Sequence, residues 1–78
     1  MSHDSVEKLV KMANQIGSFF AAQKVGAAVG MAEHLRKFWA PHMRAAIAEH
    51  VSHGGAGLDP IAIEAVKILQ AEKSKGAA

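Results

Sequence analysis

The sequence predicts an all-α fold, a small bundle of four helices with short loops. Half of the 78 residues are apolar, and most of these are Ala, Val, Ile, Leu and Met, a composition that suits helices better than sheets. Apolar residues recur three and four positions apart, and no segment alternates as a half-buried strand does. Helix start and stop signals divide the chain at Pro41, at Gly54-Gly55 and at Asp59-Pro60.

The first helix is expected over residues 4–23. Asp4 begins it, because Glu7 follows three residues later in the pattern of a capping box. Gly17 lies within this helix and costs about 1 kcal/mol relative to Ala, so we expect another helix to approach closely there. The apolar stripe at helical spacing consists of Val6, Leu9, Val10, Ala13, Ile16 and Phe20.

The second helix is expected from Val25 to Phe38 or Trp39. Gly26 and Gly30 lie one turn apart, on the flank away from its apolar face. Small residues at this spacing let a neighbouring backbone come close, so they mark either a docking groove or an ordinary tight helix crossing. The apolar face consists of Val25, Ala28, Val29, Ala32, Leu35 and Trp39.

The third helix is expected to run from Pro41 to His53. Proline suits the first helical turn, because the N–H that it lacks would have no partner there. Gly54 and Gly55 end the helix, since glycine readily adopts the left-handed conformation of a C-terminal cap. The inward positions are Met43, Ala46, Ile47 and Val51.

The fourth helix is expected to begin at Pro60, with Asp59 as its N-cap, and to end around Lys73. Its apolar positions are Ile61, Ala62, Ala65, Val66, Ile68 and Leu69. We therefore expect a single helical domain over residues 1–72 and a disordered tail over residues 73–78.

Three of the four helices carry more apolar surface than a domain of this size can bury. At 100° per residue, the apolar arcs of the first, second and fourth helices each span roughly 200°, whereas a surface helix needs only about 100°. A chain this short buries only about 60% of the surface that it exposes when unfolded. The surplus is expected to stay exposed and to mark an interface, unless alanines merely widen the arcs and every large side chain fits one core. The residues expected in the surplus are Met12, Phe19, Met31, Phe38 and Ile63.

Composition argues against several functional classes. The chain has no cysteine, so it forms no disulfide, iron–sulfur cluster or thiolate zinc site. Its net charge is +2 and its basic residues are interspersed with acidic ones, unlike the basic face of a nucleic-acid-binding protein. No apolar run approaches the ~20 residues that span a bilayer, and residues 1–4 lack the pattern of an export signal. We expect a cytoplasmic protein that binds neither nucleic acid nor membrane.

No set of residues predicts catalysis. His42, Glu49 and His53 share one side of the third helix, but one helix offers at most two or three metal ligands, and no second ligand motif faces them. The glycine-rich stretch at 54–57 follows a helix and is not followed by Lys-Ser/Thr, so it does not match a phosphate-binding loop. The serines lack the His-plus-acid pattern of a nucleophile. We assign no catalytic, cofactor-binding or metal-binding residue and expect the chain not to be an enzyme by itself.

Three sequence blocks, taken together, are familiar. They are Met12-Ala13-Asn14-Gln15-Ile16 with Phe19-Phe20, His34-Leu35-Arg36-Lys37-Phe38-Trp39 with Pro41, Met43 and Arg44, and Gly54-Gly55-Ala56-Gly57-Leu58-Asp59-Pro60 with Glu64-Ala65. In this order and spacing, from about residue 8 to 68, they resemble the delta subunit of NAD-dependent, molybdenum-containing formate dehydrogenase. Ala40 and His42 depart from the pattern, which is expected to have an acidic or amide residue and a basic residue there. Ala40 cannot cap the third helix through its side chain, a loss of typically ~1 kcal/mol.

The resemblance implies a non-catalytic accessory subunit of a cytoplasmic enzyme that oxidises formate to CO2 and reduces NAD+. In such a complex the alpha subunit carries the molybdenum or tungsten pterin cofactor and iron–sulfur clusters. The beta and gamma subunits carry FMN and further clusters. The delta subunit carries no cofactor and supports assembly or stability. The alpha subunit is the expected partner, with beta and gamma in the same complex.

The docking surface is expected at the corner of residues 38–44 and at the turn of residues 54–59. Trp39 and Arg44 are the expected anchors, because Trp and Arg dominate interface hot spots. Trp39 also lies on the main apolar stripe and is as readily explained as a core residue. The candidate partner-binding residues are Phe38, Trp39, Pro41, Met43, Arg44, Gly54, Gly55, Gly57, Leu58 and Asp59. Two alternatives remain, a self-associating helical regulator and a transient cofactor-insertion chaperone.

Overall fold

The computed structural model describes residues 2–23 and 25–77, with side chains for residues 6–23 and 25–72. The helices are α1 (Ser2–Phe20), α2 (Ala27–Phe38), α3 (Pro41–Ser52) and α4 (Pro60–Ala77). Every described element is a helix, so the predicted all-α fold with four helices is confirmed.

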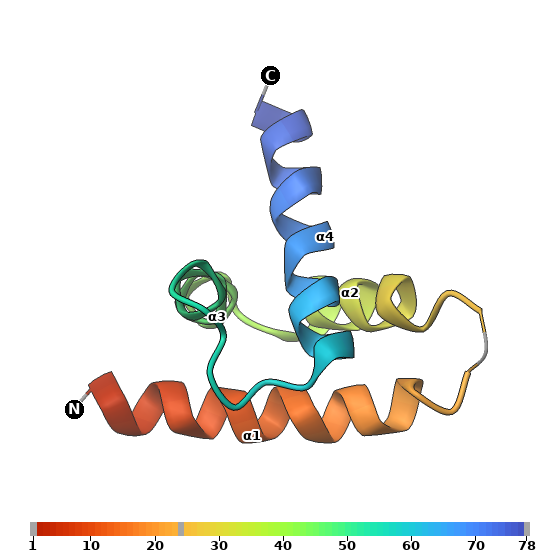
Figure 1. The fold of residues 1–78 in the computed structure, drawn as a ribbon. Coiled ribbons are helices and arrows are strands. Elements are labelled where there is room, and N and C mark those ends of the chain that lie inside the picture. The colour runs from red at the N-terminus through yellow and green to blue at the C-terminus, as the bar shows by residue number, and fades with distance from the viewer. Residues whose placement is uncertain (1, 24, 78) are drawn as a thin grey trace.

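The four helices do not run parallel to one another (Figure 1). In this view α1 and α2 run side by side in opposite directions, α3 is seen end-on, and α4 stands upright with its C-terminal half beyond the others. The core lies where the helices meet, and all four contribute to it. Its buried side chains are Leu9, Ala13, Met31, Ala32, Leu35, Trp39, Ile47, Val51, Leu58, Ala62, Ala65 and Val66.

Gly17 allows α2 and α4 to approach α1, as its position within the first helix predicts. A Cβ atom at Gly17 would lie 2.9 Å from Cγ2 of Ile61 and 3.5 Å from Sδ of Met31. Any side chain here would press on both neighbouring helices. The close approach therefore offsets the conformational cost of glycine inside a helix.

Met31 was expected in the exposed surplus, and this expectation is wrong. Its side chain is fully buried, at 0% exposure. The reason is its neighbour Gly17, because the missing side chain leaves room for the flexible thioether of Met31.

The start of α2 lies later than the sequence predicts. Gly26 is the N-cap in a left-handed conformation with φ of 73°, so Val25 falls outside the helix. Val25 and Val29, both expected on the buried face, are 87% and 60% exposed. Gly30 has close contact inside the molecule, since a Cβ there would lie 3.1 Å from the Phe20 ring. At Gly30 the small residue thus serves an internal crossing.

The two ends of the long helices also differ from expectation. α1 ends at Phe20 instead of residue 23, where the Gln23 N–H donates to the Phe20 carbonyl over 2.9 Å in a closing turn. At its other end α1 begins at Ser2, before Asp4, and the predicted capping-box partner Asp4 lies outside the described side chains. α4 continues to Ala77, beyond Lys73. The predicted division at residue 72 stays a prediction.

The boundaries of α3 follow the predicted signals. Pro41 is the first helical residue, and Ala40 makes no side-chain hydrogen bond as N-cap. At the other end the Gly55 N–H donates to the His50 carbonyl over 2.9 Å, and the Gly54 N–H donates to Val51 over 3.0 Å. These two bonds form a Schellman motif, and both glycines have positive φ.

The loop between α3 and α4 is fastened to α1 by Asn14. Its Nδ2 donates to the Gly57 carbonyl over 2.8 Å, and its Oδ1 accepts from the Asp59 N–H over 2.9 Å. On the other side, Nε2 of His50 lies 2.8 Å from the Ala56 carbonyl oxygen. One amide side chain therefore fixes the segment that leads into α4.

Replacing Gly17 by Val tests the helix crossing. The new side chain meets Ile61 and Met31, and such overpacking is expected to lower the unfolding free energy by about 1–3 kcal/mol. Ser18→Val adds the same side chain at an exposed neighbouring position and is expected to cost below about 0.7 kcal/mol. Chemical denaturation measures the unfolding free energy of both variants. Equal losses in Gly17→Val and Ser18→Val would contradict the close crossing at Gly17.

Replacing Asn14 by Ala tests the loop attachment. Two backbone groups lose their side-chain partner, so a loss of about 1–3 kcal/mol in unfolding free energy is expected. The exposed neighbour Gln15→Ala is the control, with a change within about 0.5 kcal/mol. Hydrogen exchange of the Asp59 amide should accelerate in Asn14→Ala and stay slow in Asn14→Asp, which retains the accepting oxygen. An unchanged exchange rate in Asn14→Ala would show that the Asn14 hydrogen bonds do not hold the loop in place.

Candidate functional site

A row of aromatic rings lies across α1 and α2, and we call it the aromatic face. It consists of Phe19, Phe20, His34 and Phe38. The ring centroids are 5.2 Å apart for Phe19–Phe20, 6.0 Å for Phe20–His34 and 4.7 Å for His34–Phe38. Phe19 and Phe38 at its two ends are 72% and 71% exposed. The face is therefore apolar and continuous, and its outer rings are open to a partner.

The expected apolar surplus is confirmed at three of its five positions. Met12, Phe19 and Phe38 are exposed. Ile63 is only half-buried and packs against the core, whereas Met31 is fully buried.

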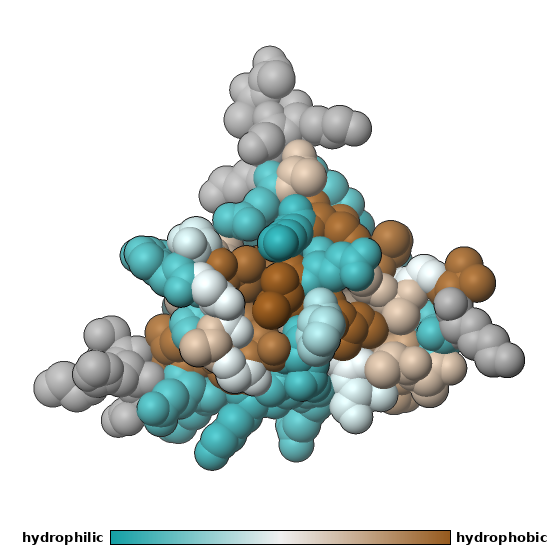
Figure 2. All heavy atoms as spheres, in the orientation of Figure 1, coloured by the Kyte–Doolittle hydropathy of each residue, from teal (hydrophilic) through white to brown (hydrophobic). Residues whose placement is uncertain are grey.

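A groove separates α3 from α4, and we call it the α3–α4 groove. Its volume is about 430 Å³. Figure 2 shows hydrophobic residues uncovered in the middle of the face in view, while the edge formed by α1 is largely hydrophilic. The residues that line the groove are Arg36, Pro41, Arg44, Ala45, Ala48, Val66, Leu69, Gln70 and Glu72.

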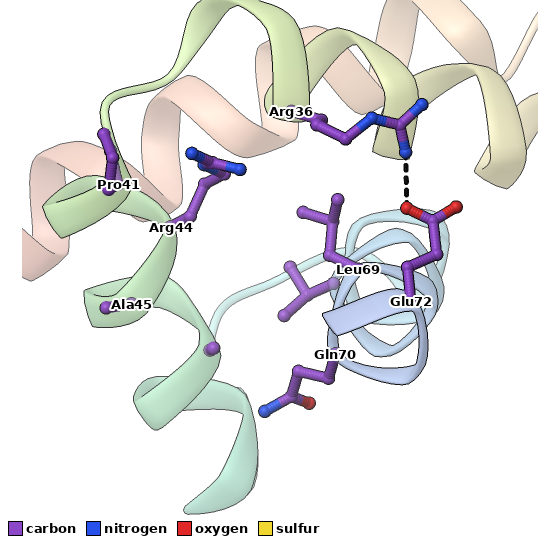
Figure 3. Close-up of a pocket in the computed structure, with 9 residues that line it drawn as sticks. Arg36, Pro41, Arg44, Ala45, Leu69, Gln70 and Glu72 are labelled. Atoms are coloured by element: carbon purple, nitrogen blue, oxygen red, sulfur yellow. Dashed lines mark hydrogen bonds and ion pairs between the residues drawn. The ribbon is translucent and has the colours of Figure 1, made fainter. Parts of the chain in front are cut away.

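The two arginines of the groove are in different situations (Figure 3). Arg36 forms an ion pair with Glu72, and its guanidinium also lies 3.8 Å from the Glu33 carboxylate. Arg44 extends from α3 toward the α2 side of the groove. Its Nε is buried and has no hydrogen-bond partner among the described residues. The Arg44 guanidinium forms no ion pair with a described residue, unlike that of Arg36.

The predicted corner at residues 38–44 divides into exposed and buried parts. Phe38 and Pro41 are exposed, and Arg44 is half-buried at the groove. Trp39 is only 5% exposed and belongs to the core cluster, as its alternative interpretation predicts. Met43 is half-buried and packs against the same core.

The predicted turn at residues 54–59 is mostly held by the molecule itself. Gly55 and Leu58 are buried, while Gly54, Gly57 and Asp59 are exposed. Corner and turn lie at opposite ends of α3, which has 12 residues and thus a length of about 18 Å. The structure does not bring the two predicted regions into one compact site.

Some residues of these surfaces escaped the sequence-based prediction. One example is the ion pair between Arg36 and Glu72, which are 36 positions apart in the sequence. No local sequence pattern predicts such a contact. His34 was closer to recognition, because it lies four positions before the predicted Phe38 and residues four apart share a helix face. Phe20 was expected in the core stripe, and its place between Phe19 and His34 required the turn from α1 to α2.

His50 and His53, at the C-terminal end of α3, have structural partners. Nδ1 of His53 lies 2.9 Å from the Glu49 backbone carbonyl oxygen, at the helix end where a partial positive charge is favourable. Among the described residues, no three His, Cys, Asp or Glu side chains cluster closely enough to hold a metal ion. Within the same residues, none of the helices combines the length and hydropathy that crossing a membrane requires.

Comparison with known proteins identifies the family. Residues 8–66 match the model of the NADH-dependent formate dehydrogenase delta subunit FdsD. No curated protein and no solved structure gave a significant match. The match covers most of the chain, including Asn14, the aromatic face, Arg44 and the turn after α3. The chain belongs to the family of NADH-dependent formate dehydrogenase delta subunits.

Proposed function

We propose that this chain is a non-catalytic accessory subunit that docks onto the catalytic alpha subunit of a formate dehydrogenase and supports the assembly or stability of the complex. The observation that carries the proposal is the aromatic face, with Phe19 and Phe38 both more than two-thirds exposed. Apolar patches of this kind usually mark interfaces. Membership of the delta-subunit family indicates which complex supplies the partner.

The aromatic face is suited to docking because its rings are already ordered. Phe20 packs over Gly30, and Phe19 meets Phe20 edge-on with an interplanar angle of 90°. His34 and Phe38 stand on the same face of α2. Side chains held in place before binding lose little conformational freedom on association. Burial of each exposed ring would contribute roughly 1.5–3 kcal/mol.

The division of labour follows from this role. In the proposed complex the alpha subunit holds the molybdenum or tungsten pterin, and the iron–sulfur clusters and FMN are distributed over the alpha, beta and gamma subunits. The delta chain contributes a contact surface and no cofactor. The proposed complex is cytoplasmic. Of the residues proposed for docking at the corner of residues 38–44, Phe38, Pro41 and Arg44 have accessible surface, and so do Gly54, Gly57 and Asp59 at the turn.

The double substitution Phe19→Ala and Phe38→Ala tests the proposal. Binding to the purified formate dehydrogenase that lacks this chain should weaken at least about tenfold, because two apolar contacts are lost. Val25→Ala is the matched control, since Val25 is exposed but lies outside the aromatic face. It should change the affinity less than about twofold. The melting temperature of the free double variant should stay near that of the wild type, because the replaced rings are exposed.

Two results would count against the proposal. The first is undiminished affinity of the double variant. The second is purification of the native chain as a homodimer with no formate dehydrogenase subunit, which would favour a self-associating regulator. Release of the chain from the mature enzyme would instead favour a transient chaperone.

A further inference from the structure

The α3–α4 groove has chemistry of its own, distinct from the aromatic face. Its floor is apolar, formed by Ala45, Ala48, Val66 and Leu69. Arg44 is its one cation without a described acidic partner, since Arg36 is paired with Glu72. An apolar floor beside an unneutralised guanidinium is complementary to a segment that carries both an apolar side chain and a carboxylate.

We propose that the α3–α4 groove receives an acidic segment of the partner subunit, with a carboxylate bound by Arg44 and an adjacent apolar side chain on the groove floor. The proposal rests on the docking function proposed above and names the chemistry of one contact. It is independent of the aromatic face.

The unpaired guanidinium of Arg44 is the observation that points to an oxygen ligand. No described carboxylate pairs with it, and its Nε is buried while its terminal nitrogens are not on the buried side. A guanidinium presents its N–H groups in a planar fork that matches the two oxygens of a carboxylate. A carboxylate that accepts from the two terminal nitrogens would neutralise the charge of Arg44.

The size of the groove indicates a peptide segment instead of a small anion. About 430 Å³ lies within the range of pockets that hold ligands of many atoms. The small side chains of Ala45 and Ala48 let a neighbouring chain approach α3 closely. A single unpaired cation is too little charge for a nucleic-acid backbone, which requires several phosphate contacts.

The Arg36–Glu72 ion pair orients the segment (Figure 3). It lies on the α4 side of the groove, and Arg44 lies on the α3 side. The Glu72 carboxylate repels a second carboxylate, so the acidic residue of the partner is directed to Arg44. The apolar side chain is then left to the floor near Leu69, which lies between the two arginines in the view.

Substitutions of the groove test the proposal in the binding assay with formate dehydrogenase that lacks this chain. Arg44→Met keeps an unbranched apolar stem and removes the charge and the donors. Ala45→Trp fills the groove and keeps Arg44. Each should weaken binding at least about 30-fold, the cost expected when a buried charge pair or its access is lost. Arg44→Lys should be intermediate, because lysine lacks the fork.

Matched controls lie outside the groove. Lys67→Met removes an exposed cation from α4, and Ala22→Trp adds an exposed indole after α1. Both should bind within about twofold of the wild type. The affinity of the wild type should fall as the salt concentration rises. This dependence on salt should be weaker in Arg44→Met and unchanged in Lys67→Met. The free Arg44→Met chain should melt close to the wild type, because Arg44 forms no ion pair with a described residue.

A photo-cross-linking residue at Ala48 identifies the occupant. In the purified complex it should capture a peptide of another subunit with Asp or Glu next to an apolar residue. Capture of a basic peptide, of a second copy of this chain or of nothing would overturn the proposal. So would wild-type affinity in both Arg44→Met and Ala45→Trp. Failure of the wild-type chain to bind the enzyme would overturn the docking function itself. Normal binding of the groove variants would overturn only the groove proposal, so the two failures are distinguishable.

Discussion

The helix crossing at Gly17 is the contact on which the rest of the structure depends. Without a side chain there, Met31 from α2 and Ile61 from α4 both reach the surface of α1. The three helices can then share one small core, even though α4 stands upright on the other two (Figure 1). A chain of 78 residues has little apolar surface to spare, so close packing at one crossing replaces the larger core that a longer domain would have.

The same crossing decides which apolar side chains remain outside. Met31 fills the space beside Gly17 and is removed from the surface. Phe20 fills the space beside Gly30, and the adjacent Phe19 is directed outward. Each glycine thus leaves room for a large neighbouring side chain. The aromatic face is the consequence, because α1 and α2 pack through their glycines and leave their phenylalanines at the rim.

The polar contacts serve a different purpose from the apolar core. Asn14 and His50 hold the turn that positions α4, and the Arg36–Glu72 ion pair joins α4 to α2. Arg44 is the exception, because its buried Nε has no described partner.

The sequence by itself determined the helices, several of their ends and the family. Pro41 and the paired glycines after α3 act through local backbone geometry, and the helical spacing of apolar residues needs no tertiary information. Only the tertiary structure decided which large side chains are buried: Met31 and Trp39 lie inside, and Val25 and Val29 lie outside, because helix rotation and the left-handed Gly26 set the exposed face. It also decided that Asn14 reaches the turn and that Arg44 stands unpaired beside an apolar groove. Those contacts join residues far apart in the chain, so no local pattern could contain them.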